Sequence, residues 1–237
     1  MSVWKFLDTG SSSGAYNMAV DEELLARAQA GGTMPVLRFY GWKPPAVSIG
    51  RFQKIENAVN ADACKQRGFD IVRRITGGRA VLHNHELTYS IVSRTDNPLF
   101  PPDVLGTYKI IAAGLLGGLR NLGINADMVS RSDRHAALVK KGTKDPSCFA
   151  SPSWYEILVN GKKIVGSAQC RVTGAFLQHG SVLIGYDPWL EAEVIPGRGT
   201  LEAATCIERV LGRDVTLEEV KPAFKKGFAE ALGMMFA

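Results

Sequence analysis

The spacing of apolar and polar residues along the chain alternates between the period of a strand and that of a helix. Alternating or continuous apolar runs bounded by turn residues predict strands at 3–7, 36–40, 46–50, 70–74, 87–92, 154–159, 162–171 and 176–184. Apolar residues three and four positions apart predict helices at 17–30, from 60 to about 68 and from 101 to about 121. Because the two patterns interleave, we expect a mixed α/β (α+β) fold.

Turn residues and helix signals refine this pattern. Asn160-Gly161 separates two strand-like runs and predicts a tight hairpin, because both turn positions require positive φ. A turn is also expected at 10–14, and residues 129–147 are expected to form a loop. From about residue 199 the chain is expected to be helical. There, Thr216 and Glu219 form a capping-box pattern, and Pro222 is expected to distort the helix.

Length and composition favour one domain spanning residues 1–237. The chain is 46% hydrophobic and 22% charged, which argues against wholesale disorder. The charge-free apolar run at 110–119 is too short to span a membrane, and no secretory signal is visible, so we expect a cytoplasmic protein. The formal charge of +5 fits either a slightly basic solvated surface or an acidic partner.

Several familiar motifs are absent or weak. Residues 10–14 match GxSxG but follow only a single short strand, so a nucleophile elbow is not favoured. There is no P-loop and no GxGxxG fingerprint, and a metal pair at His83 and His85 has little support. No basic patch interleaved with aromatic residues accompanies the arginines at 73–79, so we expect no nucleic-acid partner.

Three segments carry candidate chemistry. In the first, residues 73–83, Gly77 and Gly78 would let backbone N–H groups approach an anion or a carbonyl; a tight turn with solvated arginines is the alternative. In the second, strand alternation places Lys162 and Lys163 on opposite faces, so that one points into a cleft and the other to water. Gly166 would leave room there for a ligand.

The third segment is the proline-bracketed loop around Cys148. A cysteine just ahead of a lysine-bearing hairpin suits an activated thiol, because a nearby ammonium lowers the thiol pKa from about 8.5. A half-buried, inert cysteine is an equally good reading of the spacing. Cys64 and Cys206 read as core residues, and Cys170 is the competing candidate.

Together these segments resemble the biotin/lipoate protein ligase and lipoyl-octanoyl transferase superfamily. The matching stretches are 17–22, 37–40, 44–50, 73–90, 153–169 and 178–181, together with the final helix pattern. The resemblance implies a largely antiparallel sheet flanked by helices. Within it, Arg79 stands where the ligases carry a third glycine, so the chain is most similar to the cysteine-dependent octanoyltransferase branch of Gram-positive bacteria.

The resemblance also implies roles for individual residues. Cys148 falls on the nucleophile of that branch and Lys163 on the invariant lysine. Backbone N–H groups at Gly77-Gly78 or at His179-Gly180 would stabilise an oxyanion. The expected substrate-binding residues are Arg73, Arg74, Thr76, Gly77, Gly78, Arg79, Ala80, His83, Gly166, Ser167, Ala168, Gln169, His179 and Gly180, with Val81, Leu82 and Val165 lining an acyl tunnel.

The implied reaction moves an octanoyl group from acyl carrier protein to a lysine of a lipoyl domain through a Cys148 thioester. No ATP, metal or other cofactor is expected, and we expect a monomer. Three alternatives stay open at this point: an ATP-dependent lipoate–protein ligase, an amidotransferase that takes octanoyl from glycine-cleavage H protein, and a non-catalytic module that binds a carrier protein.

Overall fold

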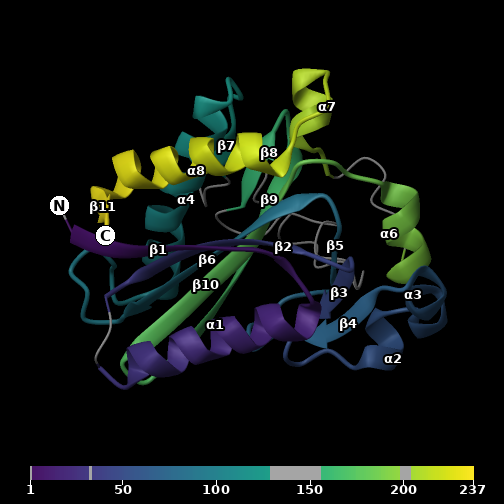
Figure 1. The fold of residues 1–237 in the computed structure, drawn as a ribbon, viewed down its shortest axis with the longest axis horizontal. Helices are drawn as coiled ribbons and strands as arrows, with labels where there is room; N and C mark the ends of the chain where they lie inside the picture. The colour runs from purple at the N-terminus through teal and green to yellow at the C-terminus, as the bar shows by residue number, and fades with distance from the viewer. Residues whose placement is uncertain (1, 32–33, 129–155, 198–203) are drawn as a thin grey trace.

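The computed structural model describes residues 2–31, 34–128, 156–197 and 204–237, and one large sheet organises them (Figure 1). Its strand order is β11-β1-β2-β6-β10-β9-β8-β7. The strands are β1 (Ser2–Ser12), β2 (Val36–Trp42), β6 (Glu86–Arg94), β7 (Asp127–Met128), β8 (Ile157–Val159), β9 (Lys162–Val172), β10 (Ala175–Leu183) and β11 (Met234–Phe236). Every pairing from β2 to β7 is antiparallel, whereas β1 runs parallel to β2 and β11. The expected mixed, largely antiparallel sheet is confirmed.

A smaller sheet stands beside one end of the large one. It has the order β4-β3-β5, with β3 (Ala46–Ile49) parallel to β4 (Asp70–Arg73) and antiparallel to β5 (Val81–His83). Three short helices accompany it: α2 (Ile55–Ala58), α3 (Ala61–Arg67) and α6 (Pro188–Val194). Asn60 caps α3 through its side chain, and Gly68 ends it in the left-handed conformation, as the sequence predicts.

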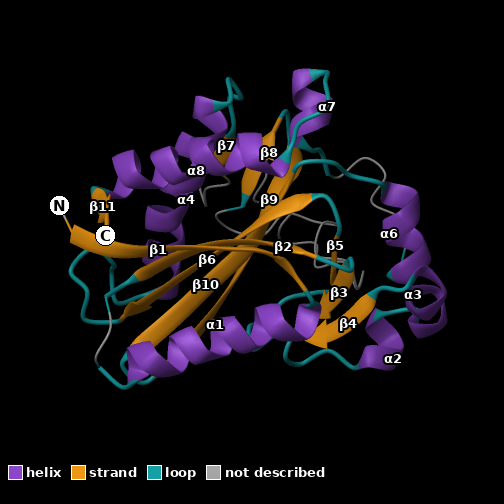
Figure 2. Ribbon diagram, in the orientation of Figure 1, coloured by secondary structure: helices purple, strands orange, loops and turns teal. Residues whose placement is uncertain are grey.

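Different helices cover the two faces of the large sheet (Figure 2). Helices α4 (Val104–Asn121) and α8 (Leu217–Leu232) cover one face, α1 (Gly14–Gln29) covers the other, and α7 (Ile207–Leu211) lies beside the start of α8. On β6, Leu87, Tyr89 and Ile91 join the apolar core with α4 and α8. The opposite face of the same strand carries Glu86, Thr88 and Ser90, and these polar residues are buried as well. Polar side chains buried on a strand need partners. Ser90 donates to Asp21 of α1, and Thr88 donates to Glu86.

The structure corrects several predicted boundaries. Residues 10–14 are not a turn: β1 continues to Ser12, and Ser13 caps α1 by accepting a hydrogen bond from the Tyr16 backbone N–H. The helix expected from residue 101 begins at Val104, because Asp103 rather than Pro101 supplies the cap. The C-terminal portion also contains β11, which the sequence did not predict.

Other local predictions are confirmed. Asn160 and Gly161 have φ of 51° and 76°, as a tight hairpin turn requires. Thr216 caps α8. The distortion expected at Pro222 does not divide the helix, because α8 runs unbroken from Leu217 to Leu232. In the part of the chain that the structure describes, no helix is long and apolar enough to cross a bilayer.

Candidate functional site

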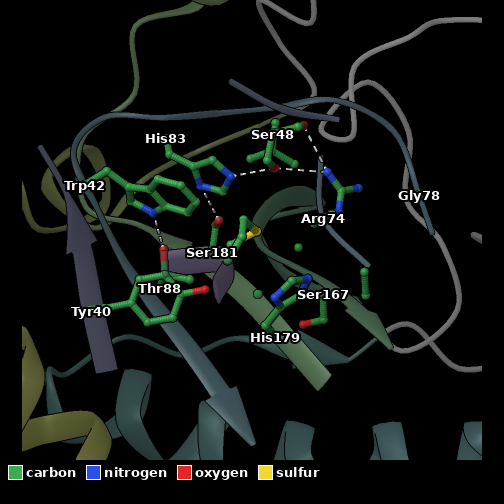
Figure 3. A pocket seen from close by; sticks show the side chains of 15 residues that line it. Tyr40, Trp42, Ser48, Arg74, Gly78, His83, Thr88, Ser167, His179 and Ser181 are labelled. Carbon is green, nitrogen blue, oxygen red and sulfur yellow. Dashed lines mark hydrogen bonds between the residues drawn. The ribbon is translucent and has the colours of Figure 1, made fainter. Parts of the chain in front are cut away.

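A pocket opens between α1, the small sheet and the central strands of the large sheet (Figure 3). Its apolar wall includes Met18, Trp42 and Val81, and most of the surface that faces the cavity is apolar, although many of the lining residues also carry polar groups. The lining residues are Met18, Tyr40, Trp42, Ser48, Arg74, Gly78, Val81, His83, Thr88, Gly166, Ser167, Ala168, His179, Gly180 and Ser181. They come from six strands, α1 and the loop that follows β4, so the site exists only in the folded chain.

Arg74 holds the loop that follows β4 from the inside. Its guanidinium is buried and donates to the backbone oxygens of Gly77 at 2.9 Å, Arg79 at 2.6 Å and Ser48 at 3.0 Å. It also donates to the hydroxyls of Thr76 at 3.1 Å and Ser48 at 3.0 Å. These bonds fix the path of residues 76–79 beside the pocket, so the solvated-arginine alternative does not apply to Arg74.

Each of the two hydroxyls that accept from Arg74 is also hydrogen-bonded to a histidine, and each histidine is hydrogen-bonded to a carboxylate. Thr76 Oγ1 lies 2.7 Å from His179 Nε2, and His179 Nδ1 lies 3.0 Å from Asp21. In the same way Ser48 Oγ lies 2.7 Å from His83 Nε2, and His83 Nδ1 lies 2.7 Å from Glu86. Each hydroxyl accepts from Arg74 and keeps its own proton available for the histidine Nε2. For His179, whose pKa is lowered by burial, we assign a neutral imidazole with its proton on Nδ1 facing Asp21.

The pKa shifts of His179 and Asp21 support a neutral imidazole facing an ionised carboxylate. Burial lowers the pKa of His179 below its ordinary 6.5, although the hydrogen bond to Asp21 opposes the shift. Burial alone would raise the pKa of Asp21, but the bonds from His179 and the charge of Arg38 lower it overall. Arg38 is itself fully buried and donates to Asp21 at 2.8 Å, so the carboxylate is held ionised.

A glycine allows β9 and β10 to form the far wall of the pocket. A Cβ at Gly180 would lie 2.4 Å from the backbone oxygen of Gly166 and 2.8 Å from the Ser167 hydroxyl. That hydroxyl is 2.7 Å from the Tyr89 hydroxyl, and burial raises the pKa of Tyr89 to about 12. A neutral phenol therefore fixes Ser167 at the edge of the pocket.

The predicted substrate-binding residues divide into two groups by position. Those at the pocket are Arg74, Gly78, His83, Gly166, Ser167, Ala168, His179 and Gly180. Arg73, Thr76, Gly77, Arg79, Ala80 and Gln169 are not among the lining residues. Contact with substrate stays a prediction for the first group.

The second group mostly shapes the loop and strands. Arg73 donates to the backbone oxygens of Gly50, Arg51 and Gln53. Ala80 packs in the core of the small sheet, and Gln169 is bonded to Gln178 across the β9–β10 ladder.

The expected acyl tunnel is corrected in part. Val81 lines the pocket, but Val165 belongs to the apolar core under α4 and α8, and Leu82 lines a separate cavity beside α6. His83 faces the pocket, whereas His85 lies 3.6 Å from Glu208, so the two rings do not converge on one metal.

The two adjacent lysines separate as strand alternation predicts. Lys162 is exposed, whereas Lys163 is 1% exposed and its ammonium is bonded to the buried Glu156. Lys163 is not among the residues that line the pocket. Cys148, the predicted nucleophile, lies outside the described residues. Of the other cysteines, Cys64 and Cys206 are buried, as expected of core residues, and Cys170 is half-buried.

Sequence reasoning missed several residues at or beside the site. These are Met18, Tyr40, Trp42, Ser48, Thr88 and Ser181 in the lining, with Asp21 and Glu86 behind them. The available signal was the set of polar positions on each alternating strand, such as Thr88 on β6 and Ser181 on β10. It did not identify the site, because a strand with one face in solvent shows the same alternation.

Comparisons with known proteins identify the family. The model of the lipoyl protein ligase A/B catalytic domain matches residues 13–229. Octanoyltransferase LipM of Kyrpidia tusciae is 44% identical, over 98% of this chain and 88% of that protein. Octanoyltransferase LipM of Bacillus subtilis is 39% identical, over 98% and 87%.

Solved structures agree with this result. A putative lipoate protein ligase from Thermoplasma acidophilum with bound lipoic acid has a TM-score of 0.79 and 27% identity, covering all of this chain and 88% of that one. Lipoate-protein ligase A bound with ATP has a TM-score of 0.80 and 28% identity, covering all of this chain and 87% of that one. The chain therefore belongs to the lipoyl protein ligase A/B catalytic domain family.

Proposed function

We propose that the protein transfers an octanoyl group from the phosphopantetheine thioester of acyl carrier protein to the ε-amine of a lysine on a lipoyl domain. The observation that carries this proposal is its similarity to octanoyltransferases, at 39–44% identity over 98% or more of the chain. The pocket supports it, because Met18, Trp42 and Val81 offer an apolar wall to an acyl chain.

The transfer takes place in two steps. The thiolate of Cys148 attacks the thioester carbonyl; a new C–S bond forms, and the phosphopantetheine sulfur leaves and takes up a proton. The neutral ε-amine of the acceptor lysine then attacks the acyl-enzyme. A C–N bond forms, the amine loses a proton, and the Cys148 thiolate is released. Because an amide is more stable than a thioester, neither ATP nor a metal ion is needed.

The loop held by Arg74 is the better source of oxyanion donors. Strand β10 is paired with β6 on one side and β9 on the other, so the N–H groups of His179 and Gly180 are committed to the ladders. This argues against the expected oxyanion role for those two residues. Gly77 and Gly78 lie in a loop instead, and a Cβ at Gly77 would meet no atom within 4 Å. We therefore assign oxyanion stabilisation to their backbone N–H groups.

The donor assay tests the proposal directly. Incubation with octanoyl–acyl carrier protein, without ATP, should give a hydroxylamine-labile octanoyl adduct on Cys148 that mass spectrometry locates. The adduct should disappear in Cys148→Ala and persist in Cys170→Ala, the matched control. An adduct that survives Cys148→Ala would overturn the assignment. Turnover only with free lipoate and ATP would favour a ligase, and turnover only with octanoylated H protein would favour an amidotransferase.

Lys163 is proposed to lower the pKa of the Cys148 thiol, and its neighbour Lys162 provides the control. Thiol reactivity measured against pH should show a higher thiol pKa in Lys163→Ala, because the ammonium no longer stabilises the thiolate. Lys162→Ala removes an exposed ammonium and should leave the thiol pKa unchanged. A thiol pKa that is the same in wild type and Lys163→Ala would remove the electrostatic role.

A further inference from the structure

The turn between β3 and α2 exposes a large aromatic side chain between two cations. Phe52 is 85% exposed, and the flanking side chains of Arg51 and Lys54 are exposed as well. The Arg51 guanidinium lies 5.6 Å from the centroid of the Phe52 ring. A single exposed apolar residue is ordinary, but an aromatic side chain bordered by cations has the composition of an interface anchor.

The positive charge of this turn is not neutralised locally. Within the described ranges, neither Arg51 nor Lys54 lies within ion-pair distance of a carboxylate. Elsewhere on the surface Arg27, Arg67 and Arg213 are each paired with a glutamate.

A third cation reinforces the patch. The exposed Arg73 is bonded to three backbone oxygens of the turn rather than to a carboxylate, so its charge adds to that of Arg51 and Lys54. The acidic residue nearest in sequence, Glu56, offsets only one of these three charges.

The turn is rigidly connected to the loop beside the pocket. The Arg51 backbone N–H donates to the Thr76 oxygen at 2.8 Å. A Cβ on Gly50 would lie only 2.0 Å from the Gly78 oxygen, so the two backbones are in direct contact. Because Gly78 lines the pocket, the aromatic side chain and its cations stand next to the site where an acyl chain would enter.

We propose that Arg51, Phe52, Lys54 and Arg73 form the surface on which an acidic acyl-bearing carrier protein docks. This inference rests on the proposed function and adds the place of contact. Phe52 would insert between apolar side chains of the carrier, while the three cations face its carboxylates and speed the encounter. We assign this surface to the donor rather than to the acceptor, because the donor must deliver a whole acyl chain into the pocket. The turn is bonded to the loop that forms one wall of that pocket.

Donor kinetics with two thioesters test the proposal. The variants are Arg51→Glu/Lys54→Glu and Phe52→Ala, assayed with octanoyl–acyl carrier protein and with octanoyl-pantetheine, which lacks the protein. Lys109→Glu/Arg120→Glu is the matched control, because it reverses two exposed cations on α4 and changes the net charge equally. We expect the KM for the carrier-borne donor to rise roughly tenfold in each variant, with kcat unchanged. Octanoyl-pantetheine kinetics and the control should stay within about twofold of wild type.

Other outcomes overturn the proposal in distinguishable ways. Equal losses with both donors would place the defect in the pocket rather than in docking. A KM change confined to the lipoyl-domain acceptor would assign the surface to the other partner. Wild-type KM values for the carrier-borne donor in both variants would remove the docking role. If wild type itself makes no product from octanoyl–acyl carrier protein, the proposed function fails before the surface is tested.

Discussion

Protonation of His179 would reverse the hydrogen bond that it shares with Thr76, because Nε2 would become a donor facing a hydroxyl that already accepts from Arg74. Burial lowers the pKa of His179, whereas the unfolded chain takes up this proton at an ordinary value near 6.5. Below about pH 6.5 the unfolded state therefore binds more protons, and the free energy of unfolding falls as pH decreases, by at most about 1.4 kcal/mol per pH unit for one group.

Urea unfolding of wild type and His179→Gln between pH 5 and pH 8 measures this contribution. The wild-type free energy of unfolding should decline toward pH 5 more steeply than that of His179→Gln, since glutamine has no proton to take up in this range. His85→Gln makes the same exchange of imidazole for amide at a side chain that is about half exposed, and it serves as the matched variant. Parallel pH profiles for wild type and His179→Gln would contradict the assigned neutral imidazole.

At the scale of single residues, the sequence points to Arg74, Thr76 and His179 but not to what they do together. The partner of His179 is Asp21, 158 positions away, and no local pattern pairs them. Strand alternation does separate Lys162 from Lys163, because that separation depends only on neighbouring residues. What the pattern cannot supply is the buried Glu156 to which Lys163 is bonded.

At the scale of elements, the contact between the turn before α2 and the loop after β4 depends on a missing side chain. Gly50→Ala would place a Cβ 2.0 Å from the Gly78 oxygen, and backbone on both sides leaves little room for adjustment. We expect this substitution to destabilise the protein by about 1–3 kcal/mol, measured by urea unfolding. Gly77→Ala, where a Cβ meets nothing within 4 Å, is the steric control. Equal stability of the two variants would argue against the close approach.

Elements with local signals were predictable, whereas elements made by tertiary pairing were not. The Asn160-Gly161 hairpin and the Asn60 cap each follow from residues that are adjacent or three positions apart. Strands β5 and β11 have three residues each, too few for a periodic pattern, and each exists because a distant strand pairs with it. The small sheet that carries Ser48 and His83 was therefore not anticipated as a unit of the site.

At the scale of the whole molecule, the main apolar core and the pocket lie on opposite faces of one sheet, and the bond between Tyr89 of the core and Ser167 of the pocket joins them. The face under α4 and α8 holds the main apolar core, and the other face holds the buried polar chains and the pocket. The two helices approach closely through glycines: a Cβ on Gly227 would lie 2.2 Å from the Gly118 backbone nitrogen and 2.6 Å from the Gly117 carbonyl carbon. A Cβ at Gly227 would therefore meet backbone atoms of α4, none of which belongs to a residue that lines the pocket.

Gly227→Ala tests whether the core and the pocket are independent. Helix propensity and packing predict changes of opposite sign in the free energy of unfolding of this variant. Alanine in a helix interior is favoured over glycine by about 1 kcal/mol, so propensity alone would stabilise the variant. The backbone clash with α4 should outweigh that gain and destabilise the protein by about 1–3 kcal/mol in urea unfolding. Lys226→Ala, on the exposed side of the same helix, should change stability by less than about 0.5 kcal/mol.

Because Gly227 lies across the sheet from the pocket, folded Gly227→Ala should retain the wild-type KM for its acyl donor at low temperature. A raised KM would show instead that the two faces of the sheet are coupled.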